Sequence, residues 1–122
     1  MKHDVKERAA FTGMIMKLFD HWKLSDQERA AVLGLKSVRT IARYRNGGVI
    51  ANRVELIKRV EHLLAIHKSL RILFPSDRDI VYGWVKAANE AFKGKRPLDV
   101  MISEGVAGLQ SVRRYLEFQR ER

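Results

Sequence analysis

Positive side chains between residues 30 and 54 offer the clearest chemistry in this sequence. No aspartate or glutamate occurs in that segment, although acidic residues are scattered through the rest of the chain. Five basic residues occur in it: Lys36, Arg39, Arg43, Arg45 and Arg53. The planar guanidinium of arginine can donate two hydrogen bonds to a guanine edge, and a cation near a helix end suits a phosphate. The segment therefore predicts recognition of a polyanion.

The sequence shows no comparable group of residues with the spacing of a catalytic site or a metal site. The histidines show no paired ligand spacing, and His62 and His67, five residues apart, would not share a helix face well. No glycine-rich phosphate loop follows a strand, and no Ser/His/Asp set can be named. We therefore expect a protein that is not an enzyme and that holds neither a metal ion nor a cofactor.

The overall composition agrees with a polyanionic partner. The 122 residues include 24 lysines and arginines against 14 aspartates and glutamates, which gives a formal net charge of +10. Without cysteine there is neither a disulfide nor a thiolate zinc site, which is compatible with a reducing compartment. No apolar run approaches the roughly 20 residues of a membrane helix, and the first ten residues lack the apolar core of a signal peptide. We expect a cytoplasmic protein without a membrane partner.

The first half of the chain must position the basic segment, and its pattern is helical. Apolar residues at helical spacing predict a helix over 7–22. Ser25 and Glu28 form a Ser-x-x-Glu capping box before a second helix, which should end at Gly34. Ser37 is a plausible N-cap for a third helix that stops at residues 46–48. Three helices in this order, ending in a short basic one, are typical of a helix-turn-helix.

The roles of the third helix follow from which of its sides is free. Ala30, Ala31 and Gly34 would let the second helix pass close behind it. We expect Ile41 to point inward, flanked by Val38 and Tyr44. The outward side chains would meet bases, and those nearer the helix ends would meet phosphates, which gives the candidate DNA-binding set Lys36, Ser37, Arg39, Thr40, Arg43, Arg45 and Arg53. The alternative is a merely solvated helix face.

The second half also has a helical pattern. A helix over about 52–73 would bury a stripe made of Val54, Ile57, Val60, Leu64 and Leu70. A break at 74–77 is followed by a helix over 77–92 that continues to Gly94. Pro97 can then begin a short helix running to Gly105, and a last helix covers about 106–119. The expected fold is all-α, with a seam near residues 70–76.

A cluster of distinctive residues lies around the loop 94–97. It consists of Trp84, Asn89, Phe92, Gly94, Pro97, Leu98 and Asp99. Asn89 and Asp99 could brace the loop by side-chain to backbone hydrogen bonds, and the aromatic residues are either core or an anchor at a protein interface. The arginine-rich end of the chain is either a fraying surface helix or an arm that docks on a partner.

These residues carry a resemblance to a known family. The string WVKAANEAFKGKRPLDVMISEG resembles the toxin-binding domain of the Xre/MbcA/ParS antitoxins, which shows Trp, then Asn, Phe and Gly, then Pro-Leu-Asp and a further Gly. Upstream, LSDQERAAVLGL, VRTIARYRNG and RVEHLLAIHKSLRILFP resemble the family's Xre-like helix-turn-helix and connecting helix. One departure is Lys36, which stands where the family usually has a hydroxyl, with Ser37 next. A shift by one residue leaves open whether Arg39 or Thr40 meets bases.

The resemblance implies a function that composition does not. Members of this family are antitoxins of type II toxin–antitoxin pairs. These antitoxins usually block the active site of a RES-domain, NAD-consuming toxin, and they repress their own operon. It implies a DNA-binding domain with connecting helix at 1–70 and a toxin-binding domain at 71–122. Because helix-turn-helix readers usually bind paired half-sites about 34 Å apart, we also expect a homodimer on operator DNA, hence association with the nucleoid. The residues expected to meet the toxin are Trp84, Asn89, Phe92, Arg113, Arg114, Leu116, Arg120 and Arg122.

Two other functions remain possible on the sequence. One is a stand-alone helix-turn-helix regulator of transcription whose second half only dimerises. The other is a basic nucleoid or RNA-binding protein, which would bind without sequence preference and with a steep dependence on salt. A reading frame for a RES-type toxin beside the gene would favour the antitoxin.

Overall fold

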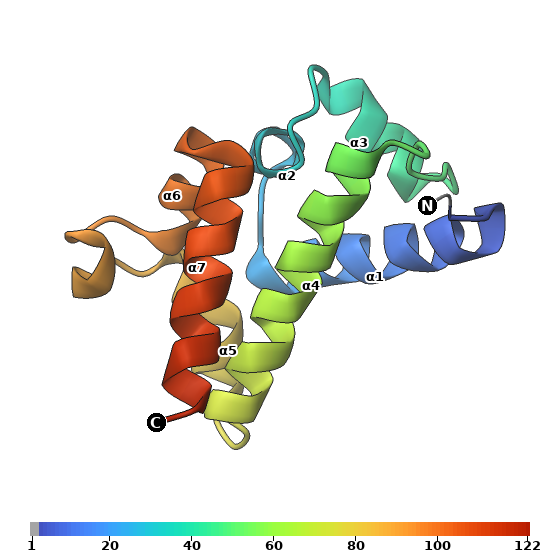
Figure 1. Ribbon diagram of the computed structural model, residues 1–122. Helices are drawn as coiled ribbons and strands as arrows, with labels where there is room; N and C mark the ends of the chain where they lie inside the picture. Colours follow the sequence, from blue (N-terminus) through green and yellow to red (C-terminus); the bar gives the residue numbers. More distant parts are fainter. Residues whose placement is uncertain (1–2) are drawn as a thin grey trace.

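Helices account for the regular structure of residues 3–122, the part of the chain that this computed structural model describes, and no strand occurs there. The all-α prediction is confirmed. Figure 1 shows the elements, which in chain order are α1 (Val5–Trp22), α2 (Asp26–Val32), α3 (Val38–Arg45), α4 (Val54–Leu73), α5 (Arg78–Gly83), the 3-10 turns η1 (Trp84–Lys86) and η2 (Glu90–Phe92), α6 (Pro97–Ser103) and α7 (Gly105–Arg120). None of the helices in this part is long and apolar enough to cross a membrane.

The capping residues of the first half act as the sequence predicts. The Ser25 hydroxyl accepts a hydrogen bond from the Glu28 backbone N–H at 3.1 Å, and the Glu28 carboxylate accepts one from the Ser25 N–H at 2.8 Å. The Ser37 hydroxyl caps α3 by accepting from the Arg39 N–H at 3.1 Å. The turn between α2 and α3 places Gly34 at φ +69°, in the left-handed region that favours glycine. These local signals define the helix-turn-helix.

The predicted helix over residues 77–92 is wrong, because α5 ends at Gly83. Two 3-10 turns follow, and the chain folds back so that the Asn89 N–H donates to the Lys95 carbonyl oxygen at 3.1 Å. The Asn89 side chain accepts from the Ala91 N–H at 2.9 Å, a local bond that competes with helix formation. The spacing of the aromatic residues here therefore reflects a turn that brings their rings together.

The core crosses both halves of the chain. In Figure 1, α7 lies beside α4, α1 crosses α4, and α2 and α3 sit toward one end of α4 while α5 sits at the other. Side chains from α1, α4 and α7 form one continuous buried cluster. The stripe predicted for α4 needs correction, because Val54 in its first turn is 69% exposed and Leu64 is half-buried. The buried residues of α4 are Leu56, Ile57, Val60, Leu63, Ile66, Ser69 and Leu70.

The last two helices meet where a glycine permits close contact. A side chain at Gly108 would overlap the backbone carbonyl of Val100, so only glycine fits between α6 and α7. Pro97 begins α6 in its first turn, as predicted, and Asp99 pairs with Arg96 through contacts of 2.7 and 2.8 Å. That pairing lowers the pKa of the Asp99 carboxyl. The loop before α6 is thus joined to α6, which packs closely on α7, the helix that carries the arginine-rich end.

Candidate DNA-binding and partner-binding surfaces

The third helix packs one side against the fold and leaves the other free. Ile41 is fully buried and Tyr44 is 5% exposed, so these two side chains fix its orientation. Burial also raises the pKa of the Tyr44 hydroxyl. Ala30, from α2, is 5% exposed and supplies the small side chain needed behind α3. The inward positions of Ile41 and Tyr44 are confirmed.

The free side of α3 presents two arginines and two small apolar residues. Arg39 and Arg43 are exposed, and because they are four residues apart they share one face. Val38 is 43% exposed, which corrects the prediction that it points inward, and with Ala42 it forms a parallel apolar row. Apolar side chains of this kind contact thymine methyl groups. Thr40, predicted to point outward, is half-buried.

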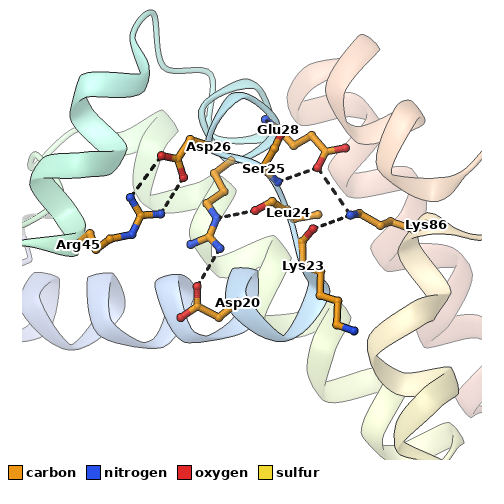
Figure 2. Close-up of polar contacts among 9 residues, drawn as sticks. Asp20, Lys23, Leu24, Ser25, Asp26, Glu28, Arg45 and Lys86 are labelled. Atoms are coloured by element: carbon orange, nitrogen blue, oxygen red, sulfur yellow. Dashed lines mark hydrogen bonds and ion pairs between the residues drawn. The ribbon is translucent and has the colours of Figure 1, made fainter.

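Arg45 is the basic residue of this segment that is already paired. Its guanidinium donates to the Asp26 carboxylate at 2.7 and 3.3 Å, as Figure 2 shows. The hydrogen bond lowers the pKa of Asp26 and raises that of Arg45. Because Asp26 belongs to the start of α2, the contact joins the first turn of α2 to the last turn of α3. Sequence reasoning missed this pair, since Asp26 lies outside the acid-free segment.

The other predicted DNA contacts stay available. Within residues 3–122, the side chains of Lys36, Arg39, Arg43 and Arg53 form no ion pair, and all four are exposed. Lys36 lies before α3 and Arg53 is the residue before α4. Ser37 uses its hydroxyl for the cap of α3. The arrangement gives two central arginines with flanking cations, as a reader of a DNA groove requires.

A buried arginine, which the spacing of the residues did not predict, sets the position of α2 on α1. Arg29 is 6% exposed, and its guanidinium donates to the Asp20 carboxylate at 2.8 Å and to the Leu24 carbonyl at 3.0 Å. It also lies over the Phe19 ring at 5.8 Å. Arg29 lies just before the acid-free segment, and its burial shows that it serves the fold.

Lys86 connects the two halves of the chain. Its ammonium donates to the Lys23 carbonyl oxygen at 2.6 Å and lies 3.8 Å from the Glu28 carboxylate, the same group that caps α2 (Figure 2). η1, which carries Lys86, precedes the loop with Asn89. The start of α2 is therefore in contact with the part of the second half that was singled out by sequence.

In the second half, three aromatic rings gather. Trp84 and Phe92 are joined by Tyr115 of α7, with ring centroids 6.3 Å apart for Trp84 and Tyr115, and 5.3 Å apart for Phe92 and Tyr115. All three are half-buried. Sequence reasoning missed Tyr115, although its place beside Leu116 on an amphipathic helix was a usable signal. The rings form a partly open aromatic cluster.

The arginines of α7 and the tail differ in their contacts. Arg113 donates to Glu117 at 3.0 Å and lies 3.2 Å from the His62 ring, and burial followed by this guanidinium lowers the pKa of His62. Arg120 donates to the Ser69 hydroxyl at 3.3 Å, and Arg122 donates to Gln119 at 3.4 Å. Arg114 is exposed, and its side chain forms no ion pair with another described residue.

Two apolar residues of α7 have opposite positions. Leu116 is 1% exposed and packs in the core, so its predicted contact with a partner is corrected to a role in the fold. Phe118, which sequence reasoning passed over, is 63% exposed. A large exposed aromatic residue beside arginines is typical of protein interfaces. Among residues 3–122 no group of side chains is arranged to hold a metal ion.

Comparison with known proteins matches both halves. Residues 3–64 match the antitoxin Xre-like helix-turn-helix domain, and residues 69–122 match the antitoxin Xre/MbcA/ParS C-terminal toxin-binding domain. The chain is also 31% identical over 105 residues to an uncharacterized protein, y4oB, of Sinorhizobium fredii (strain NBRC 101917 / NGR234). That similarity covers 85% of this chain and 79% of the relative.

Proposed function

The chain belongs to the Xre/MbcA/ParS antitoxins, and we propose that it blocks the active site of a cognate RES-domain toxin and represses its own operon. As an antitoxin it is not an enzyme, and its two domains imply a toxin and DNA as partners. What we propose beyond membership of the family is the class of the toxin, the blocking of its active site, the homodimer and the repression of the operon. The division at residues 70 and 71 also remains a prediction.

The observation that best supports DNA reading is the exposed pair Arg39 and Arg43 on a helix fixed by Ile41 and Tyr44. A pair of arginines held four residues apart can reach neighbouring base edges once α3 enters the major groove. Helix-turn-helix proteins usually bind paired half-sites about 34 Å apart, which supports a homodimer. A gel-shift assay on the DNA upstream of the gene, against random DNA of equal length, tests sequence preference. Equal affinity for both would contradict repression.

For the toxin, the proposal uses the aromatic cluster of Trp84, Phe92 and Tyr115 together with the free side of α7. Aromatic and arginine side chains are enriched among residues that dominate binding energy at interfaces. On α7 and the tail, Arg114, Phe118 and Arg122 are exposed and able to meet a partner. The RES class rests on the family resemblance, in which the antitoxin covers the cleft that binds NAD.

Co-expression with the product of the neighbouring reading frame tests the toxin half of the proposal. We expect the toxin alone to deplete cellular NAD and stop growth, and the intact antitoxin to restore both. Trp84→Ala should weaken rescue, whereas Arg39→Ala should leave rescue intact because it lies on the DNA-binding side. A neighbouring product that neither binds the chain nor stops growth would leave a stand-alone regulator as the better reading.

A further inference from the structure

A groove of about 830 Å³ lies between α1, α4 and α5, and it carries an uncompensated positive charge. Four basic residues line it: Lys17, Lys68, Arg71 and Arg78. No aspartate or glutamate lines the groove, and none of the four side chains forms an ion pair with any described residue. Such a surface favours an anionic occupant.

Apolar surface accompanies these charges. Met14 is 48% exposed and Ile72 is 47% exposed, and both line the groove. Its lining includes the Tyr82 ring, which stacks with the rings of His21, at 4.4 Å between centroids, and His67, at 5.8 Å. The His67 Nδ1 atom is buried without a hydrogen-bond partner. An occupant that satisfied the whole surface would therefore carry both acidic and apolar groups.

The position of the groove argues against DNA and against a second copy of the chain. α4 is a 20-residue helix, about 30 Å long, and Figure 1 shows α3 toward one end of it and α5 toward the other. The groove is lined by α5 and by the second half of α4, from Leu64 to Ile72. DNA bound to α3 would thus lie most of a helix length away. Two copies facing each other through the groove would bring like charges together, which disfavours association.

The groove instead adjoins a hollow at the end of α7. Ile72 lines both the groove and a smaller hollow of about 380 Å³, whose other residues are Glu117, Arg120 and Glu121. Those residues belong to the tail that the proposed function directs toward the toxin. A toxin that covers the end of α7 would therefore reach the groove without leaving the surface.

We propose that the groove between α1, α4 and α5 is a second contact site for the cognate toxin, and that it receives an acidic segment of the toxin carrying apolar side chains. The inference rests on the proposed function, because it assumes that the partner is a toxin. It adds a surface that includes α1 of the helix-turn-helix half. The antitoxin thus holds the toxin with both of its halves.

Charge reversal on the full-length chain tests the electrostatic part. With the purified product of the neighbouring toxin gene as probe, the double variant Lys68→Glu with Arg71→Glu should bind about tenfold more weakly. The control is Lys6→Glu with Lys58→Glu, which changes the net charge equally at exposed positions outside the groove. The control should stay within threefold of the wild type. Equal losses in the two double variants would overturn the proposal.

Substitution of one apolar residue tests whether the apolar surface of the groove contributes to toxin binding. Met14→Ser, at a 48% exposed groove residue that does not line the hollow at α7, should weaken toxin binding several-fold, whereas Ile80→Ser, at an exposed apolar residue outside the groove, should not. Because the exchanged residues are exposed, the thermal midpoint should stay within a few degrees. If a reversed-charge variant unfolds, Lys68→Gln with Arg71→Gln replaces it, with about threefold weaker binding expected.

The outcomes separate this inference from the proposed function. A wild-type chain that does not bind the toxin overturns the proposed function itself. A wild-type chain that binds, with groove variants that bind equally well and an α7 variant such as Phe118→Ser that does not, overturns only the groove. Loss of toxin binding in the groove variants, with both controls intact, supports the second contact site.

Discussion

Arg39 and Lys36 are the residues at which DNA reading and simple charge attraction can be told apart. Arg39 stands on the free side of α3, where its fork can reach a base edge. Lys36 lies before the helix, where we expect its ammonium to reach only the backbone of DNA. Both are exposed and unpaired in the described structure, so neither substitution should disturb the fold.

Arg39→Ala should lower affinity for the operator by about 1–3 kcal/mol and relax the preference for it over random DNA. Lys36→Ala should weaken both DNAs by similar amounts and reduce the slope of log affinity against log salt by about one. Fluorescence anisotropy at several salt concentrations measures both. The same response from the two variants would show that Arg39 also binds only phosphate.

Arg45 provides a second test of DNA binding by a single residue, because its guanidinium is already paired with the Asp26 carboxylate. Asp26→Asn removes the charge that competes for the guanidinium while keeping a similar shape. We expect this variant to bind DNA more tightly and with a slightly steeper salt dependence, since one more cation becomes available. A loss of affinity would mean that the Arg45–Asp26 contact is needed to aim α3.

At the level of elements, the turn between α2 and α3 depends on Gly34. A methyl group there would lie 2.8 Å from the Arg59 guanidinium carbon, and the backbone has φ +69°. Arg59 is itself held, because its guanidinium donates to the Val32 carbonyl at 3.2 Å. Gly34 therefore has a backbone conformation that favours glycine, and it lies beside the Arg59 guanidinium, which its hydrogen bond to Val32 holds in place.

Gly34→Ala should lower the free energy of unfolding by about 1–2 kcal/mol, the cost of a left-handed residue with a side chain. Gly13→Ala is the matched control, because Gly13 lies within α1 and a methyl group there meets nothing within 4 Å. That change should raise stability by up to about 1 kcal/mol, since alanine favours a helix. Urea unfolding followed by circular dichroism compares the two, and a stable Gly34→Ala variant would contradict the account.

For the whole molecule, two histidines make the packing of the halves sensitive to acid. Burial, then the Arg113 guanidinium, lowers the pKa of His62, which lies between α4 and α7. Burial, then Arg71 and His21, lowers the pKa of His67 in the groove. Both rings are neutral in the fold and take up protons more readily when the chain unfolds. Their stabilising effect is therefore present above the ordinary histidine pKa of about 6.5 and is lost as pH falls below it.

Stability should accordingly fall between pH 7.5 and pH 5.5, and His62→Gln with His67→Gln should flatten that dependence. Urea unfolding at a series of pH values provides the measurement, with wild-type chain in the same buffers as reference. If the stability of the wild type rose on acidification over this range, the assignment of neutral, partly buried rings would be wrong.

Contact between the halves can be tested at Lys86. Lys86→Ala removes the hydrogen bond to the Lys23 carbonyl and should cost about 0.5–1.5 kcal/mol of stability. Lys95→Ala is a fair control, because Lys95 is exposed and its ammonium forms no ion pair with any residue of the described part of the chain. Equal stability of both variants would mean that water replaces the Lys86 contact at no cost.

The sequence by itself determined what depends on near neighbours. Capping at Ser25 and Ser37, the turn at Gly34, the inward Ile41 and the helical class follow from interactions within a few residues, so local spacing predicts them. The family motifs around Trp84 and Asp99 likewise needed only the order of residues.

Tertiary structure alone decided the contacts between distant residues. Asp26 neutralises Arg45 from 19 positions away, Arg29 is buried against Asp20, and Tyr115 completes an aromatic cluster whose other members were read as one helix. The exposure of Val38 and the burial of Leu116 depend on which neighbouring helices happen to cover each side. Charge pairing and burial are set by distances in space, which the order of residues along the chain does not contain.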